Sequence, residues 1–524
     1  NAAEWGHSYH LLRSARDISK LTSSLEEKRL PLFSAFIAPF LFLFEPVAAG
    51  RVVVALATFV TLFLSYLVSK KLFPQKDFHI WVPILLAISP VFFYWSLRVM
   101  AITTFLAFVL AFFYFFYKER VQEIPRLIKE EPPVSNYIIL GILVGLACLT
   151  RYEGFFLLPG LFLFFFFRKE WLEGVIFAAS WAVVTLPWFI WSKLIAQGPT
   201  SASYFEEAGG FKLLDWSRFR FFALSYLFLF IFPPFFIFVF KGVRTFLKKN
   251  EDLIVHLPLL CYLGFETLLF FYWTPSVPRI MLSIAPFLLI FFLVGVEDIQ
   301  CSKGGIAFRN RYFSLWFLAS TALFVVYVVG QYFERVYFLI LSQGGLALAL
   351  LFSGLAFISL LLRNRIKSRR LFFSFLILTF TISSFVVIDN QRRVSETIDK
   401  ISLQAVAKKD GKVAYFDETG VSWWYLNVLN DKGVYYTEQM HYSAQDQWEW
   451  LKENNVRYLI WSKEFNRGTV LDVVDHRDYI DRFERLDMKV VPVADTIDSF
   501  LISRGILTEK EYPKLRSELY EIKY

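Results

Sequence analysis

The sequence predicts an all-α polytopic membrane domain followed by a small, water-soluble α/β domain. The chain is 56% hydrophobic and only 19% charged, whereas an ordinary soluble protein is about 45–50% apolar and about 25% charged. Its apolar residues form runs long enough to cross a bilayer. Its last quarter is polar and mildly acidic, while the part before it is apolar and basic. These observations together indicate a membrane protein with a soluble tail.

Segments with the length of a spanning helix, about 20 mostly apolar residues, recur along most of the chain. About twelve are expected, at residues 51–69, 78–97, 99–117, 136–150, 153–167, 173–193, 221–240, 254–272, 280–298, 313–333, 341–362 and 370–388. A further candidate, 31–48, is interrupted by Pro39 and carries Glu45. This favours a segment in the outer interface over one that crosses the bilayer.

The distribution of Lys and Arg predicts the orientation, because cytoplasmic loops are enriched in basic residues. Starting from the basic loop 363–370, alternation assigns five further basic loops to the cytoplasm, at residues 70–77, 118–135, 168–172, 241–253 and 299–312. The opposite face then holds the turn at 98–100, Arg151 with Tyr152, the loops 194–220 and 273–279, and the C-terminal domain.

Charge also separates the soluble tail from the rest of the chain. Residues 396–524 hold 23 of the 46 acidic residues and 18 of the 55 basic ones, which gives this segment a net charge of −5. The net charge of the whole chain is +9, so the preceding residues carry +14. Basic residues in loops beside apolar segments fit a membrane protein and argue against nucleic acid as a partner. No cysteine lies in the tail, so no disulfide framework is expected there.

We therefore expect three parts. Residues 1–50 form an outer-face loop with amphipathic and juxtamembrane helices, residues 51–390 the transmembrane helical domain, and residues 391–524 the extracytoplasmic α/β domain. Within the first part, residues 8–20 place apolar side chains at helical spacing and predict an amphipathic helix. Such a helix either lies on the membrane surface or packs against protein.

The tail alternates strand-like and helix-like runs, which is typical of a small α/β layer structure. The expected helices are near 421–430, 443–454 and 469–484. The expected strands are Val413–Phe416, Val434–Tyr436, Val456–Trp461, Val490–Val493 and Phe500–Ser503.

Ionisable residues gather on the predicted outer face, where burial beside lipid is costly and a functional role is the default explanation. The candidates are Glu4, Lys28, Arg29, Arg98, Arg151, Glu153 and Arg279. Guanidinium groups make paired hydrogen bonds to phosphate oxygens, so a set of such cations suits a lipid-linked phosphate. A single interfacial arginine more often reaches toward lipid headgroups, so the expectation rests on the set.

Four segments stand in order at predicted outer helix ends: Lys28-Arg-Leu-Pro-Leu-Phe33, Ser89-Pro-Val-Phe-Phe-Tyr-Trp-Ser-Leu-Arg98, Leu149-Thr-Arg-Tyr-Glu-Gly-Phe-Phe-Leu-Leu-Pro159 and Pro278-Arg-Ile-Met-Leu-Ser-Ile-Ala-Pro286. They resemble motifs of the GT-C membrane glycosyltransferases, which include the protein O-mannosyltransferases and aminoarabinose transferases. The likeness covers about residues 1–300.

The resemblance implies a polyprenyl-phosphate-linked sugar as donor and inverting transfer to a protein, lipid or glycan acceptor on the extracytoplasmic face. It implies that the first outer loop supplies a carboxylate that acts as a base or as a metal ligand, so a divalent metal ion stays open as a cofactor. Glu4 is the nearest match for that carboxylate. Lys28, Arg29, Arg98, Arg151, Glu153 and Arg279 are then expected to bind substrate. A first helix before Asn1 is also implied.

The sequence departs from the family pattern at two places. The motif of the first loop begins with Asp, which is not present after Asn1, and many members carry an acid where this chain has Thr103. Two alternatives therefore stay open beside the transferase: a catalytically inactive protein of GT-C architecture, and a lipid or solute transporter. A transporter would show internal repeats and midplane charges, whereas the sequence shows no repeat and its charges gather at one face.

Overall fold

The computed structural model describes residues 6–21, 30–120, 133–194, 235–249, 252–272, 278–301, 351–356, 358, 365–392 and 410–415, and in the tail residues 424, 426, 429–431, 433–435, 450–462, 483–486 and 517–522. The chain divides into two compact units. Unit 1 contains Asn1–Arg13 and Val386–Tyr524, and unit 2 contains Ser14–Phe385.

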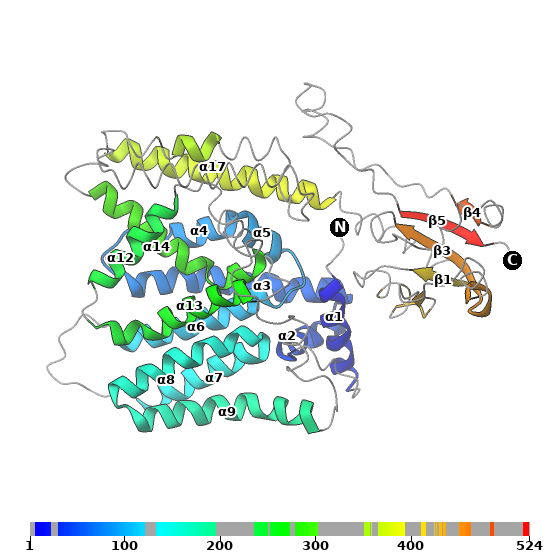
Figure 1. The fold of residues 1–524 in the computed structure, drawn as a ribbon, viewed down its shortest axis with the longest axis horizontal. Helices are drawn as coiled ribbons and strands as arrows, with labels where there is room; N and C mark the ends of the chain where they lie inside the picture. Colours follow the sequence, from blue (N-terminus) through cyan, green and yellow to red (C-terminus); the bar gives the residue numbers. More distant parts are fainter. Residues whose placement is uncertain are drawn as a thin grey trace. The chain divides into compact units, whose positions relative to one another are not determined.

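The described part of unit 2 is helical, and its helices lie side by side in a bundle (Figure 1). Short 3-10 segments, labelled η, adjoin several of the α-helices. The described helical elements are α1 (Gly6–Ser19), α2 (Leu32–Ile37), η1 (Ala38–Phe42), α3 (Pro46–Leu72), α4 (Trp81–Ile88), α5 (Pro90–Ser96), α6 (Ile102–Arg120), α7 (Val134–Thr150), η2 (Tyr152–Phe156), α8 (Leu157–Arg168), α9 (Trp171–Leu194), α12 (Phe236–Lys249), η4 (Leu253–His256), α13 (Leu257–Tyr272), η5 (Pro278–Ser283), α14 (Ala285–Cys301) and α17 (Arg365–Arg392). The unit boundaries fall inside α1, after Arg13, and inside α17, after Phe385.

The segment 78–97, expected as one spanning helix, is instead two short helices. Helix α4 ends at Ile88 and α5 begins at Pro90, and Ser89 between them is extended, with φ −64° and ψ 128°. The ring of a proline disfavours the helical conformation in the residue before it, which explains the break at Ser89. The prediction of a continuous helix was therefore wrong here.

The segment 31–48 is also interrupted. Its helical residues are the six of α2 and the five of η1, and the next helix starts only at Pro46. Six α-helical residues at about 1.5 Å and five 3-10 residues at about 2.0 Å extend about 19 Å, well short of the hydrocarbon thickness of about 30 Å. The length agrees with the prediction that this segment does not cross.

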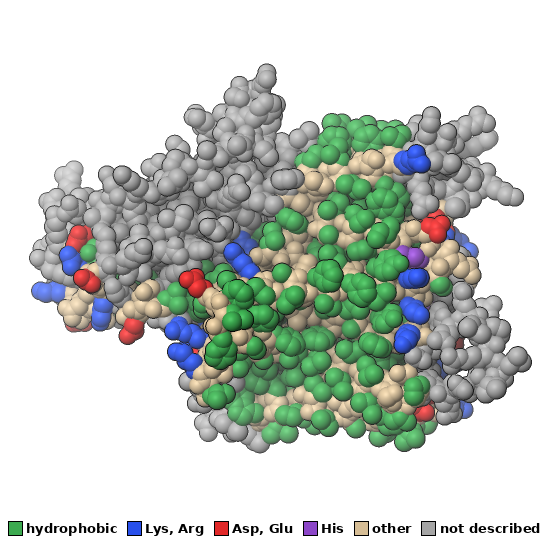
Figure 2. All heavy atoms as spheres, turned by 180° about the vertical axis from the view of Figure 1, so that it is seen from behind, with side chains coloured by type: hydrophobic (Ala, Val, Ile, Leu, Met, Phe, Trp, Pro, Cys, Tyr) green, Lys and Arg blue, Asp and Glu red, His purple; other side chains and the backbone are tan. Residues whose placement is uncertain are grey.

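Two described helices, Pro46–Leu72 and Trp171–Ser192, are long and apolar enough to cross a membrane by length and composition. Large apolar side chains on both point outward: Phe59 is 71% exposed and Val183 is 75% exposed. Hydrophobic side chains cover much of the helical unit in Figure 2, as a lipid-facing surface requires. The full count of about twelve spans stays a prediction, because 195–234 and 302–350 lie outside the described residues.

Helices α12 and α14 pack backbone to backbone through two glycines. A Cβ atom at Gly242 would lie 1.8 Å from the carbonyl oxygen of Phe291, and one at Gly295 would lie 1.9 Å from that of Phe238. Small residues allow this close approach, which is how helices associate where no hydrophobic effect drives them together.

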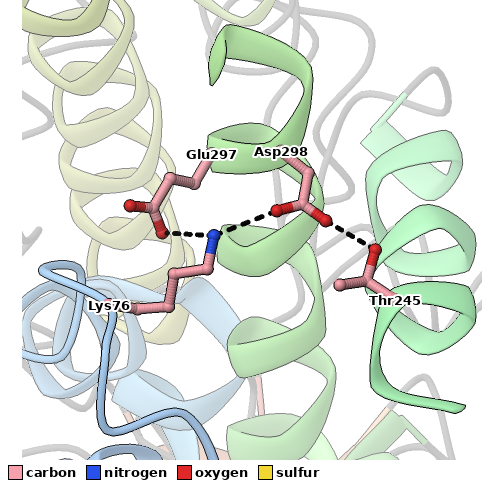
Figure 3. A network of polar contacts seen from close by, with 4 residues as sticks. All are labelled: Lys76, Thr245, Glu297 and Asp298. Carbon is pink, nitrogen blue, oxygen red and sulfur yellow. Dashed lines mark hydrogen bonds and ion pairs between the residues drawn. The ribbon is translucent and has the colours of Figure 1, made fainter. Parts of the chain in front are cut away.

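Charged side chains join three elements at one end of the bundle (Figure 3). Lys76 Nζ, from the loop between α3 and α4, lies 3.0 Å from Asp298 Oδ1 and 3.4 Å from Glu297 Oε2 on α14. Thr245 Oγ1 on α12 donates to Asp298 Oδ2 at 2.5 Å. Burial lowers the pKa of Lys76, but its hydrogen bond to Asp298 and the charges of both acids outweigh this and raise the pKa.

A second ion pair joins Arg168 to Asp252. Both contacts involve loops that the positive-inside rule assigns to the cytoplasm. Lys76 of loop 70–77 and Thr245 of loop 241–253 meet at Asp298, the last residue of the predicted span 280–298. Arg168 joins loop 168–172 to loop 241–253 through Asp252. Loops predicted to share one side therefore do lie together in the fold.

The described tail contains a five-stranded mixed sheet with the order β2-β1-β3-β5-β4. Strands β1 (Lys412–Tyr415), β2 (Gly433–Tyr435) and β3 (Val456–Ser462) run parallel and match three predicted strands, while β4 (Phe483–Leu486) and β5 (Ser517–Ile522) are antiparallel additions that were not predicted. The other two predicted strands, and most of the predicted helices, lie outside the described residues.

Helix α1 confirms the predicted amphipathic helix near the N-terminus. Its apolar side chains are covered by protein, since Leu12 and Ala15 are 0% exposed and Leu11 is 6% exposed. Within unit 1, the buried ring of Tyr9 lies 5.6 Å from the buried ring of Trp424. Of the two readings of this helix, packing against protein is the one observed.

We expect Gly295→Ala to lower the free energy of unfolding by about 1–3 kcal/mol, because the added methyl group would overlap the carbonyl of Phe238 and force α12 and α14 apart. Gly264→Ala on α13 is the matched control, since nothing lies within 4 Å of its Cβ position. Thermal unfolding in detergent measures both variants. Equal melting temperatures would contradict the close packing of α12 and α14.

We expect Asp298→Ala to destabilise the protein more than Glu297→Ala. Asp298 bonds both Lys76 and Thr245, whereas Glu297 makes only a longer contact with Lys76. Loss of the first is expected to cost about 1–3 kcal/mol. The same unfolding experiment ranks the two variants, and a larger loss for Glu297→Ala would overturn the network as drawn in Figure 3.

Candidate active site at one end of the helical bundle

The segment 149–159 forms a tight corner between α7 and α8. Helix α7 ends at Thr150, Arg151 is extended (φ −151°, ψ 146°), and η2 turns the chain into α8. A Cβ atom at Gly154 would lie 2.5 Å from the backbone nitrogen of Cys148, so only glycine lets η2 fold back onto α7. The corner places Arg151 and Glu153 at the end of the bundle that the sequence assigns to the outer face.

Arg151 and Glu153 form an ion pair at this corner. Both Nε, at 3.1 Å, and Nη2 of Arg151 donate to Glu153 Oε1. The side chains are 16% and 13% exposed, so the pair is only partly shielded from solvent. Two expected substrate-binding residues thus lie in direct contact.

Glu266 is a third charged residue in this region, and the reading of the sequence missed it. It lies on α13, is 1% exposed, and has the side chains of Tyr262 and Ser283 as hydrogen-bonding neighbours. Its electrostatic neighbours include Glu153 and Arg151. A lone acid within the apolar run 254–272 was the available signal, because an ionisable residue inside a membrane helix is a functional candidate by default.

The segment η5 lies against the same group of helix ends. Tyr262 on α13 donates from its hydroxyl to the carbonyl of Ser283 at 3.4 Å, and Ser283 is also close to Glu266. Helices α5, α6 and α13 all contact η5, and α13 also contacts η2. Arg279 is the second residue of η5, so its backbone lies in this region.

Arg98 follows α5 in the same region. It is 5% exposed, and its guanidinium carbon lies 5.1 Å from the ring centre of Tyr94, a cation–π distance. Thr103, which occupies the position where the sequence comparison expects an acid, is 1% exposed, and its backbone carbonyl accepts a hydrogen bond from Thr61. A neutral side chain therefore fills that position.

The predicted site residues thus fall into three groups. Arg151 and Glu153 are in contact, and Arg98 and Arg279 lie on segments that meet at η5. Glu4, Lys28 and Arg29 lie outside the described residues.

A divalent metal ion was left open by the sequence, so we tested whether the residues fit one. Within the described ranges, no three His, Cys, Asp or Glu side chains lie close enough together to hold a metal ion. The two acids that do approach each other, Glu153 and Glu266, have Arg151 beside them, and a cation in that position competes with a metal ion. We therefore assign no metal ligands.

Residues 28–191 match the model of the family described as dolichyl-phosphate-mannose-protein mannosyltransferase. This range runs from the Lys28 segment through α9 and includes Arg98, Arg151 and Glu153. No curated protein matches the sequence.

The fold is similar to that of ArnT from Cupriavidus metallidurans, solved with undecaprenyl phosphate bound, with a TM-score of 0.58 and 12% identity over 91% of each chain. The apo state of ArnT gives a TM-score of 0.58 at 14% identity, over 91% of this chain and 90% of that one. The Archaeoglobus fulgidus oligosaccharyltransferase, solved with a tethered acceptor peptide, gives a TM-score of 0.50 at 12% identity, over 88% of this chain and 65% of that one.

The sequence motifs, the family match and the shared membrane fold agree with one another. Together they show that the chain has the fold of these membrane enzymes and that residues 28–191 resemble the mannosyltransferase family.

Proposed function

We propose that the protein transfers a sugar from a polyprenyl-phosphate-linked donor to an acceptor on the extracytoplasmic side of the cell membrane. The observation that carries this proposal is the meeting of α5, η2, α13 and η5 at one end of the bundle, with Arg98, Arg151, Glu153 and Glu266 among them. Similarity to a protein that binds undecaprenyl phosphate supports the lipid-linked donor.

The orientation follows from charge. The end with the Lys76 network and the Arg168–Asp252 pair belongs to the basic loops that face the cytoplasm under the positive-inside rule. The Arg151 corner is at the other end of α7 and therefore faces outward. The tail 391–524 is proposed to be the extracytoplasmic domain, and residues 1–50 the outer loop that precedes the spanning domain 51–390.

The proposed reaction is a single displacement at the anomeric carbon. An acceptor hydroxyl attacks this carbon while its bond to the phosphate oxygen breaks, and polyprenyl phosphate leaves with the bonding electron pair. Glu4 takes the hydroxyl proton as general base. Arg279, with Arg98, Lys28 and Arg29, holds the phosphate and stabilises the charge that develops on it. No step is assigned to a metal ion.

The acceptor class is open among protein, lipid and glycan hydroxyls. Similarity to an oligosaccharyltransferase solved with an acceptor peptide makes a protein acceptor the first to test. The surrounding membrane lipids complete the set of partners, since the donor must diffuse to the site within the bilayer.

We expect Arg279→Ala to abolish sugar transfer in proteoliposomes that contain a panel of polyprenyl-phosphate sugars and acceptor peptides, because the variant loses a cation that binds the leaving phosphate. Arg244→Ala on α12, at the predicted cytoplasmic end, is the matched control and should transfer normally. Radiolabel moved from lipid to acceptor is the measurement. Undiminished transfer by Arg279→Ala would remove Arg279 from the site.

A further inference from the structure

Two buried polar side chains of α13 contact the segment η5, which carries Arg279. We infer that Tyr262 and Glu266 are positioning residues, which hold η5 against α13 and so fix the backbone of Arg279 for the proposed reaction. This inference rests on the proposed function and deepens it, because it gives a role to two residues that the reaction itself does not use.

The segment η5 is a place where regular helical hydrogen bonding is interrupted. It is a 3-10 segment of six residues, Pro278–Ser283, and α14 begins two residues after its end. Inside a membrane protein, such backbone is tolerated only where neighbouring groups supply the hydrogen bonds that a continuous helix would have made. The hydroxyl of Tyr262 supplies one of them, since it donates to the carbonyl oxygen of Ser283 at 3.4 Å. This contact joins the end of η5 to α13.

Packing fixes the direction in which the Tyr262 hydroxyl points. The side chain is 0% exposed. The centre of its ring lies 5.9 Å from that of Phe113 on α6 and 6.3 Å from that of Phe287 on α14. A ring enclosed by two other helices has little freedom to turn, because protein interiors are close-packed. The donor is therefore held in place before any ligand arrives.

Glu266 connects the two hydroxyl groups. It follows Tyr262 by four residues on α13, so both side chains lie on one face of the helix. Glu266 and Ser283 are each 1% exposed, and the side chains of Tyr262 and Ser283 are hydrogen-bonding neighbours of the carboxyl group. A neutral carboxyl group, the form that burial away from water favours, has one donor and one acceptor. It can therefore donate to the Tyr262 hydroxyl and accept from the Ser283 hydroxyl.

The competing explanation is that Glu266 balances the charge of Arg151. Helix α13 also contacts η2, and Arg151 and Glu153 are electrostatic neighbours of Glu266. Arg151 already forms an ion pair with Glu153, however, so a second negative charge is not required to neutralise it. The two explanations differ in whether a neutral side chain of the same shape can replace Glu266.

The test uses the full chain in proteoliposomes. Tyr262→Phe removes the donor, Glu266→Leu removes the carboxyl group, and Glu266→Gln keeps one donor and one acceptor without a charge. Tyr117→Phe on α6 is the matched control, because this tyrosine is also 0% exposed and its hydroxyl lies 3.3 Å from His256 Nδ1, beside the predicted cytoplasmic loop 118–135. For each protein we would measure KM and kcat for the lipid-linked sugar, the inhibition constant of sugar-free polyprenyl phosphate, the melting temperature, and the amide hydrogen exchange of residues 278–284.

We expect Tyr262→Phe and Glu266→Leu to speed exchange in residues 278–284 and to raise the inhibition constant about three- to tenfold. This factor corresponds to one hydrogen bond, which phosphate binding must then replace in ordering η5. Glu266→Gln should stay within about twofold of the wild type. Tyr117→Phe should lower the melting temperature about as much as Tyr262→Phe and leave the inhibition constant and the exchange unchanged. The double variant Tyr262→Phe/Glu266→Leu should lose less than the sum of its parts, because both residues belong to one network.

Three results would overturn the inference. Unchanged exchange or an unchanged inhibition constant in Tyr262→Phe would show that its hydroxyl does not hold η5. A loss in Glu266→Gln as large as that in Glu266→Leu would make the charge beside Arg151 the essential feature. An equal rise of the inhibition constant in Tyr117→Phe would reduce the effect to general stability. By contrast, a wild-type protein that neither binds polyprenyl phosphate nor transfers sugar would overturn the proposed function, and the exchange of residues 278–284 would still decide whether Tyr262 holds η5.

Discussion

The free-energy cost of placing a charged group in the bilayer determines where ionisable side chains lie in this protein. Ionisable groups are gathered at the two ends of the helical unit, and between the ends the outward surface is apolar, as Phe59 and Val183 show. At one end Lys76 is neutralised by two acids of α14, which joins three elements through one amine. At the other end the Arg151–Glu153 ion pair lies near the buried Glu266, whose neighbours include Tyr262 and Ser283. Acidic and basic side chains therefore meet at both ends of the described bundle.

The second constraint is backbone hydrogen bonding, which permits irregular chain inside a membrane protein only where protein or a polar cavity meets its needs. The interruption at Ser89 breaks a segment that hydropathy predicts as one helix, and η2 and η5 replace the first α-helical turn of the predicted spans 153–167 and 280–298. The η2 and η5 interruptions lie at the end that holds the candidate site. These turns bring Arg151, Glu153 and the backbone of Arg279 to helix ends, and Gly154 keeps the η2 turn closed against α7.

These features define what could be predicted from the sequence. Composition and loop charge were sufficient for the membrane class and for the grouping of loops that the Lys76 and Arg168 contacts confirm. Motif resemblance predicted Arg151 and Glu153 as site residues, and the fold brings these two side chains into contact. Glu266 was missed because a single acid within an apolar segment does not reveal its neighbours. Only the fold shows that Glu266 lies near Glu153. Which helices pack against each other is a property of the tertiary structure. A hydropathy value averaged over a window of sequence contains no information on such contacts.

The break at Ser89 shows a different limit. The rule that a proline restricts the residue before it was available in the sequence, but membrane helices often continue through a proline because neighbouring groups satisfy the freed carbonyl. Pro187 shows this, since it lies inside α9 without ending it. The two prolines differ in their tertiary surroundings, since α5 contacts η5 whereas α9 lies at the outside of the bundle. The same residue type therefore interrupts the helix at Pro90 and is accommodated within the helix at Pro187.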